Sequence, residues 1–97
     1  MISPRLSAEL VVQTATALLV GGLAPREALT ILATQVPQAK ANAPALVRDD
    51  SARAATYADL LRSLAADLGR QLESSDDPRD LRAVIDDVER VAQALSG

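Results

Sequence analysis

The chain has 97 residues, a net charge of −3 and 48% apolar side chains, which is enough material for one domain around one core. Its 19 alanines, 15 leucines and nine arginines are accompanied by one tyrosine and by no histidine, cysteine, tryptophan or phenylalanine. Those absences exclude disulfides and thiol chemistry, and they remove the residues from which most active sites, zinc centres and base-stacking surfaces are built. The abundance of helix formers predicts a single all-α domain over residues 1–97.

Charged residues divide the chain into two unlike halves. Residues 1–48 carry four basic and two acidic side chains, a net of +2, whereas residues 49–97 carry six basic and eleven acidic ones, a net of −5. We therefore expect the first half to be largely covered and the second half to face water on one side. In the second half arginines alternate with aspartates instead of forming a basic stripe, so no nucleic-acid partner is predicted.

The first predicted helix covers about residues 4–20. Ser3 is a favoured N-cap residue, and Pro4 suits the first turn because its missing N–H is not needed there. Gly21 and Gly22 can supply the left-handed residue that ends a helix. A helix of about 17 residues therefore fits between these two signals.

A second helix is predicted over residues 25–36. It begins at Pro25 and is expected to end before Pro37, because proline cannot donate the backbone hydrogen bond of a helix interior. The short link from the first helix predicts an antiparallel helical hairpin. Residues 37–47 place two prolines among helix formers, which is compatible with a short helical turn or with an extended crossing of the bundle.

The third predicted helix, residues 51–74, shows the clearest apolar periodicity. Asp49, Asp50 and Ser51 offer N-cap residues. Apolar side chains then recur every three or four residues, at Ala54, Tyr57, Leu61, Leu64, Leu68 and Leu72. The spacing on the outer face predicts three ion pairs, Asp49 with Arg53, Asp59 with Arg62 and Asp67 with Arg70.

The fourth predicted helix covers residues 78–95. Asp77 is expected to cap it by accepting hydrogen bonds from first-turn amides, with Pro78 at the first position and Asp80 near the positive end of the helix dipole. An apolar seam follows, made of Leu81, Val84, Val88, Val91 and Leu95. Together the elements predict a small up-down bundle of four main helices, which oligomerisation could complete.

The first helix is apolar on nearly its whole circumference, which requires burial on nearly all sides. Two arrangements satisfy this requirement: a central position among the other three helices, or an interface with a second copy of the chain. Tyr57 is expected to lie in the core or at the bundle end with its hydroxyl reaching water, or else to anchor an interface. The candidate interface residues are Val12, Leu19, Tyr57, Val84, Val88, Val91 and Leu95.

No catalytic, cofactor-binding or metal-binding residue is predicted. Lys40 lies in a polar, proline-flanked run and is expected to be solvated. The aspartates are expected to act at helix starts or on solvated faces instead of binding Mg²⁺ or Ca²⁺; they are Asp49, Asp50, Asp76, Asp77, Asp80, Asp86 and Asp87. Accordingly, no cofactor is expected.

The sequence favours a protein without a membrane span. Its longest uncharged stretch, Leu10–Pro25, has 16 residues, whereas a bilayer requires about 20 predominantly apolar ones. Glu9 lies inside what would be the apolar region of a signal peptide, so none is expected and the predicted location is cytoplasmic. Nine arginines against one lysine, with many alanines, are typical of a high-GC bacterial genome.

One turn of the sequence carries a family resemblance. The apolar first helix leads into the pattern AGL-P--EAL, which this chain matches with Gly22, Leu23, Pro25, Glu27, Ala28 and Leu29. Residues 10–37 therefore resemble the first helical hairpin in the cytoplasmic domains of inner-membrane platform proteins of type II secretion and of type IV or Tad pilus systems. The resemblance implies a small helical domain that docks an ATPase or pilus subunits and has no catalytic residues of its own.

From these features we expect a non-enzymatic helical protein–protein interaction module: an adaptor, chaperone or assembly component. Its partners are proteins, and it is expected to form a homo-oligomer, a dimer or larger. The soluble cytoplasmic domain of a secretion or pilus platform protein is the alternative. An enzyme or ligand carrier is a further hypothesis, which a convergent polar cluster inside the bundle would support.

Overall fold

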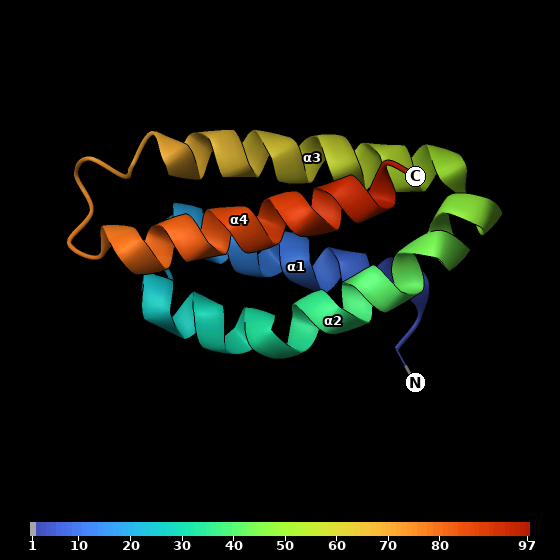
Figure 1. Ribbon diagram of the computed structural model, residues 1–97, viewed down its shortest axis with the longest axis horizontal. Coiled ribbons are helices and arrows are strands. Elements are labelled where there is room, and N and C mark those ends of the chain that lie inside the picture. The colour runs from blue at the N-terminus through green and yellow to red at the C-terminus, as the bar shows by residue number, and fades with distance from the viewer. Residues whose placement is uncertain (1) are drawn as a thin grey trace.

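The computed structural model describes residues 2–97, which form four helices. Figure 1 shows that short links join them. The helices are α1 (Pro4–Leu19), α2 (Pro25–Asp49), α3 (Ser51–Gly69) and α4 (Pro78–Leu95). They run alternately in opposite directions, and no strand occurs within residues 2–97. The predicted all-α, up-down bundle is thereby confirmed.

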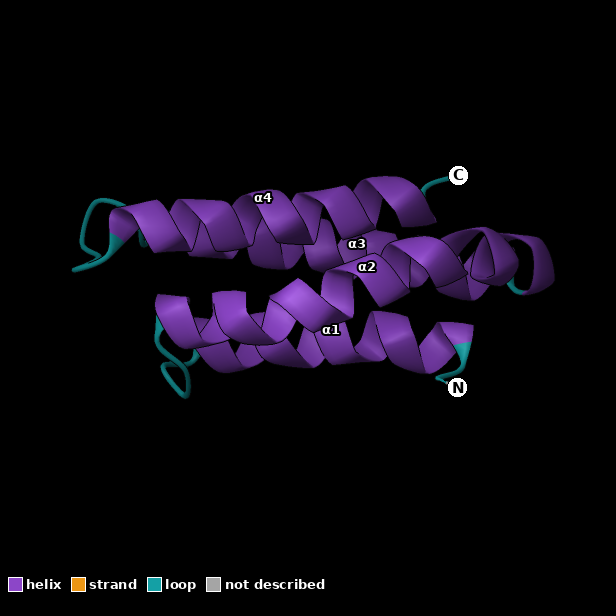
Figure 2. Ribbon diagram, turned by 60° about the horizontal axis from the view of Figure 1, so that its bottom comes forward, coloured by secondary structure: helices purple, strands orange, loops and turns teal. Residues whose placement is uncertain are grey.

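The helices form two antiparallel hairpins, α1 with α2 and α3 with α4, stacked as two layers (Figure 2). The most extensive contact is between α2 and α4, followed by those within the two hairpins; α1 and α4 barely touch. Consecutive helices α2 and α3 therefore lie diagonally, and α4 is packed between them. The resulting rod measures 40 × 23 × 18 Å.

The core is built from small and medium-sized aliphatic side chains. Of the 23 buried apolar residues in the described chain, nine are alanines, and the others are leucine, valine and one isoleucine. Buried residues recur every three or four positions on each helix, as the sequence predicted. Because alanine occupies little space, the helix backbones can approach closely, but each alanine also removes little apolar surface from water.

The caps of the first hairpin follow the sequence prediction. The Ser3 hydroxyl accepts a hydrogen bond from the Leu6 N–H at 3.1 Å. Gly21 has a left-handed φ of 86°, and the N–H of Gly22 reaches the Ala17 carbonyl at 2.7 Å, which completes a Schellman turn. The helix ends one residue earlier than predicted, and α2 begins at Pro25 as predicted.

The prediction that the second helix ends before Pro37 is wrong, because α2 continues to Asp49 through both Pro37 and Pro44. Each proline deprives the carbonyl four residues earlier of its partner, here the carbonyls of Ala33 and Lys40. The two prolines and the two residues whose carbonyls lose a partner are all exposed, so water can replace the missing amides. The proline rings on the outer side also bend the helix convex toward solvent, and α2 curves along the bundle (Figure 1).

One residue, Asp50, separates α2 from α3. Its N–H donates to the Leu46 carbonyl at 2.8 Å, and its carboxylate accepts from the Arg53 N–H at 3.2 Å. The Arg53 Nε also lies 3.1 Å from the second Asp50 oxygen. The predicted Asp49–Arg53 ion pair is therefore wrong, because Arg53 is already bound by its cap residue and Asp49 pairs with Arg48 at 3.1 Å.

The third helix ends at Gly69, five residues before the predicted end. Beyond it the chain continues in single turns, in which the N–H of Gln71 reaches Leu68 O at 3.0 Å and that of Leu72 reaches Gly69 O at 3.3 Å. Glycine has a low helix propensity, which explains the early end. Leu72 still packs against the core from this turn. Two predicted ion pairs on the outer face are confirmed, Asp59 with Arg62 and Asp67 with Arg70.

At the start of α4 the predicted side-chain cap is absent. Asp77 occupies the N-cap position, but its carboxylate accepts no hydrogen bond from the first turn, and its own N–H donates to Ser75 Oγ at 3.0 Å. Its side chain lies beside that of Asp80, and the interaction with Asp77, followed by burial, raises the pKa of Asp80 above its usual value. The predicted cap is therefore wrong, because the Asp77 side chain lies beside Asp80 instead of reaching the first-turn amides.

The starts of α3 and α4 can be compared directly, because both have an aspartate at the N-cap position but only Asp50 makes a side-chain cap hydrogen bond. Asp50→Ala should lower the free energy of unfolding by about 1 kcal/mol because it removes a side-chain cap, which corresponds to roughly 4 to 8 °C in melting temperature. Asp77→Ala should cost less than about 0.5 kcal/mol, because it removes no cap hydrogen bond and separates Asp80 from a like charge. Thermal unfolding followed by circular dichroism compares them. An equal loss for both variants would contradict the difference between the two helix starts.

Two adjacent leucines on α3 test which side of this helix faces the core. Leu61 is fully buried, whereas 41% of Leu60 is exposed. Leu61→Ala should cost about 2 to 5 kcal/mol through lost burial and a cavity, and Leu60→Ala should cost less than about 1 kcal/mol. Urea unfolding measures both values under the same conditions. A greater loss for Leu60→Ala would show that the helix is rotated from the position described.

Candidate functional site

The seam of α4, predicted as an interface, lies inside the chain's own core. Val84, Val88 and Val91 are fully buried and Leu95 is 2% exposed. Because α4 packs against α2 on one side and α3 on the other, its apolar stripe has no free surface to offer a partner. These four residues are therefore core residues in this fold, and a charge at Val88 would unfold the bundle.

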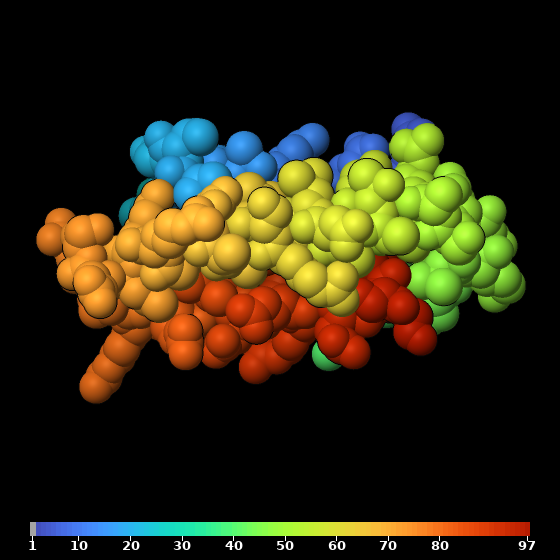
Figure 3. Space-filling model, turned by 90° about the horizontal axis from the view of Figure 1, so that it is seen from above, coloured from blue at the N-terminus to red at the C-terminus, as the bar shows by residue number. Residues whose placement is uncertain are grey.

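The first helix is neither central nor buried all round. Figure 3 shows α1 along one edge of the molecule, with α3 in front and α4 along the opposite edge. Only one stripe of α1 is fully covered, made of Ser7, Ala8, Val11, Thr14, Ala15 and Leu18. Val12 and Leu19, two predicted interface residues, are partly buried against the core. Of the two predicted arrangements, the central position within the chain is therefore wrong, because a bundle of four helices leaves each helix an outer side.

A buried polar contact fixes how α1 lies against α2. The Thr14 hydroxyl is 2.7 Å from Gln35 Oε1 on α2 and 3.0 Å from the Leu10 carbonyl, so it can donate to either. Since the helices are antiparallel, residues whose numbers sum to about 49 lie side by side. Leu18 is then level with Ile31, and Val11 is level with Gln38.

This register brings uncharged side chains together on the outer flank of the first hairpin. An α-helix turns about 100° per residue, so the residues three or four positions from Leu10 lie on the same side of α1 as Leu10 does. The residues three or four positions from Ile31 likewise share one side of α2, and both sides face away from the second hairpin. Leu6 is 42% exposed and Ile31 is 37% exposed. We define the α1/α2 face as Leu6, Leu10, Gln13, Ala17, Ile31, Thr34 and Gln38, all of which are exposed or half-buried.

Sequence reasoning missed Ile31 as a surface residue. Ending the second helix at Pro37 left too short a segment to define which of its sides is buried. Treated as one helix through Pro44, α2 has its buried centre near Leu32 and Val36, and Ile31 falls about 100° away from Leu32. The signal was therefore available, but only after the prolines had been accepted as helical.

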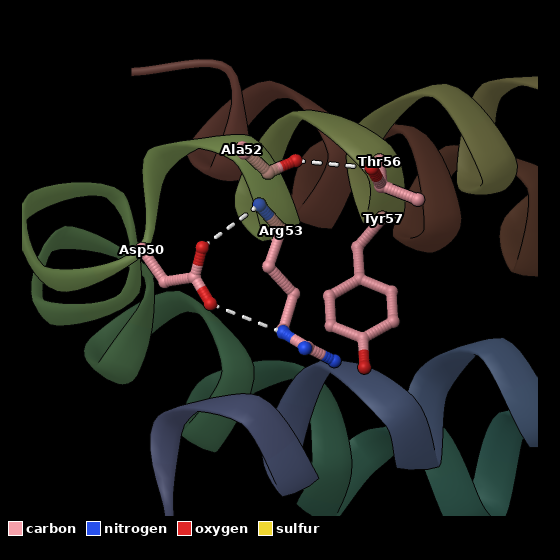
Figure 4. Close-up of a pocket in the computed structure, with 5 residues that line it drawn as sticks. All are labelled: Asp50, Ala52, Arg53, Thr56 and Tyr57. Carbon is pink, nitrogen blue, oxygen red and sulfur yellow. Dashed lines mark hydrogen bonds and ion pairs between the residues drawn. The ribbon is translucent and has the colours of Figure 1, made fainter.

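Tyr57 links α1 to α3 through a polar cluster at the end of the bundle. Its hydroxyl donates to Glu9 Oε1 at 2.6 Å, and the Arg5 Nε lies 3.4 Å from the same oxygen. In Figure 4, Arg53 and Tyr57 point from α3 toward α1, and Asp50, the residue before α3, points toward Arg53. The three side chains line an open hollow of about 370 Å³. Tyr57 is partly buried against the core, which agrees with one of the predicted alternatives, but its hydroxyl donates to Glu9 where water was expected.

The electrostatics of the cluster favour a neutral phenol and a charged guanidinium. Partial burial, followed by the hydrogen bond to Glu9, raises the pKa of Tyr57, and Arg53 opposes this shift. The pKa of Arg53 is also raised, chiefly by its hydrogen bond with Tyr57 and then by Asp50. The cluster lies on the bundle rim, and its groups bind one another, so its evident role is to hold α1 against α3.

The aspartates lie at helix starts and on the outer faces of the helices. Within residues 2–97 no three acidic side chains converge in a way that could hold a metal ion. Asp87 instead pairs with Arg90 at 2.7 Å. Every helix in that range also falls short of the length and apolar character that crossing a bilayer requires.

Comparison with family models, curated proteins and solved structures found no match for this chain. The surfaces and contacts described above are therefore the basis for inferring its function.

The raised pKa of Tyr57, caused first by partial burial and then by the hydrogen bond to Glu9, makes the stability of the fold depend on pH in the alkaline range. The pKa of Tyr57 is raised in the folded chain, so the folded state holds this proton more tightly than the unfolded state, whose pKa is about 10. The contribution is therefore complete below about pH 10 and is lost as the pH rises through the higher folded value. Tyr57→Phe should cost about 1 kcal/mol at pH 7, and this difference should shrink toward pH 11. Urea unfolding at several pH values measures it, and a difference that is independent of pH would contradict the raised pKa of Tyr57 in the folded chain.

Proposed function

We propose that this chain is a non-enzymatic helical protein–protein interaction module, an adaptor, chaperone or assembly component that forms homo-oligomers in the bacterial cytoplasm. The observation that carries the proposal is the apolar surface of α1 that the chain's own fold leaves uncovered. Leu6 is 42% exposed and Leu10 is half-buried, although both lie on the most apolar helix of the chain. Contiguous exposed apolar surface is typical of protein interaction sites.

The composition of the core supports association. Nine of its 23 buried apolar residues are alanines, and none is aromatic, so the core gains little burial per residue. Covering the outer side of α1 would remove further apolar surface from water. The non-enzymatic part of the proposal is supported by the sequence, which has no histidine or cysteine to act as a base or nucleophile.

The alternative proposal, a soluble domain of a secretion or pilus platform protein, is supported by the first hairpin. The resemblance over residues 10–37 implies two helices joined by a glycine-containing turn, and α1 and α2 are joined by Gly21 and Gly22. Both proposals assign the chain a protein partner. They differ in that the platform domain would bind an ATPase or pilus subunit.

Mass measurement of the purified chain tests the proposed homo-oligomer. Light scattering at micromolar concentrations should give at least twice the chain mass of 10.2 kDa. Leu19→Glu is a second variant, on the other flank of α1. Because Leu19 packs against the core, this substitution should lower the stability of the fold in addition to any effect on the measured mass. A mass of 10.2 kDa at every concentration, together with no bound protein after affinity capture from the source lysate, would refute the proposed function.

A further inference from the structure

We propose that the α1/α2 face is covered by the same face of a second copy, related to the first by a two-fold axis. This inference rests on the proposed function and specifies both its surface and its partner. A two-fold interface uses one patch on both subunits, so a single self-complementary face is sufficient. The α1/α2 face meets this requirement because it combines exposed apolar side chains with uncharged amides and a hydroxyl.

The charge of the face favours a second copy as its occupant. None of its seven side chains is ionisable, although the chain has 23 charged residues. The next position on that side of α2, Glu27, accepts a hydrogen bond from the Ala24 N–H at 2.9 Å. The centres of protein interfaces are depleted of charge, and covering an ionic surface with an uncharged one leaves its charges desolvated and unpaired. The best match for this face on the chain is therefore the face itself.

The other exposed apolar residues lie in less suitable surroundings. Leu60 on α3 follows Asp59, which pairs with Arg62 at 3.6 Å. The flank between α1 and α3 also holds the cluster of Glu9, Arg53 and Tyr57, which would lose water if it were covered. Val20 is 75% exposed but lies in the turn at the end of α1, outside any helix face.

The size of the face predicts a weak, reversible dimer. The 16 residues of α1 span about 24 Å, and two adjacent helices are roughly 20 Å wide, which gives a flat footprint of about 480 Å². A stable interface usually buries about 800 Å² per partner. We therefore expect a dimer with a micromolar dissociation constant, whose population rises with protein concentration.

Charge substitutions on and off the face test the proposal. The double variant Leu6→Glu/Ile31→Glu should weaken self-association at least tenfold, because each copy buries two new carboxylates. Leu60→Glu is the matched control, since Leu60 is equally exposed on α3, and it should associate as the wild type does. Sedimentation equilibrium gives the dissociation constants, and circular dichroism should show unchanged helix content in all three proteins. If Leu60→Glu weakens association and the double variant does not, the proposed face is wrong.

Salt dependence separates this contact from one between oppositely charged halves of the chain. Association through an uncharged face should keep the same affinity, or gain affinity, when sodium chloride rises from about 0.05 to 0.5 M. An interface between the basic first half and the acidic second half would weaken over that range. A large loss of affinity in salt would overturn the proposal.

A single introduced cysteine tests the two-fold symmetry, because the chain has none of its own. Gln13 lies near the middle of α1 on the α1/α2 face, so two Gln13→Cys copies should form a disulfide-linked dimer on mild oxidation. Gln93→Cys, exposed on α4, is the control and should remain monomeric. Cross-linking of Gln93→Cys without Gln13→Cys would refute the symmetric arrangement.

The outcomes distinguish this inference from the proposed function. A wild-type chain that is monomeric at all concentrations, but captures a different protein through a surface that Leu6→Glu/Ile31→Glu disrupts, overturns the second copy as occupant and leaves the interaction module in place. A chain that neither associates nor captures a partner overturns both.

Discussion

The valine seam of α4 is the contact on which the bundle depends. Val84, Val88 and Val91 are fully buried between α2 and α3, two helices that follow one another in sequence but lie diagonally in the fold. Without α4, both α2 and α3 would lose their most extensive helix contact. Because valine and the facing alanines are small, the contact requires close helix packing, and an ionised side chain at the seam could not be solvated.

The position of α1 follows from that arrangement. Once α4 has filled the space between α2 and α3, α1 can pack against α2 and α3 but barely reaches α4. One of its sides is fully buried, and two contacts hold its flanks, Thr14 with Gln35 on α2 and Glu9 with Tyr57 on α3. The outer side retains the apolar residues that carry the proposed interaction surface. The stability of the fold and the proposed association therefore share one cause, a helix more apolar than its place in the bundle requires.

Local signals decided most helix starts but fewer helix ends. Ser3, Asp50 and the prolines at the first turns begin their helices where predicted, since capping depends on neighbouring residues. Pro37 did not end α2, because its missing hydrogen bond lies on the solvent side and the packing of α2 on α4 outweighs the loss. Gly69 ended α3 early, where the apolar pattern alone continued to Leu72. In α2, packing outweighed a local stop signal, and in α3 the backbone freedom of a glycine ended the helix before the periodic pattern did.

The sequence by itself determined the class of the fold, the number of its helices, their alternating directions and the apolar stripe of each. It also identified α1 as the helix with surplus apolar surface, because that property is visible on the helical wheel. Only the tertiary structure decided that the α4 seam is core and that Leu6 and Ile31 share an exposed face. These facts depend on which helices are neighbours and on their register, set here by contacts such as Thr14 with Gln35 between residues 21 positions apart. Periodicity describes one helix at a time, so it cannot tell whether the partner of an apolar stripe is another helix of the same chain or a second molecule.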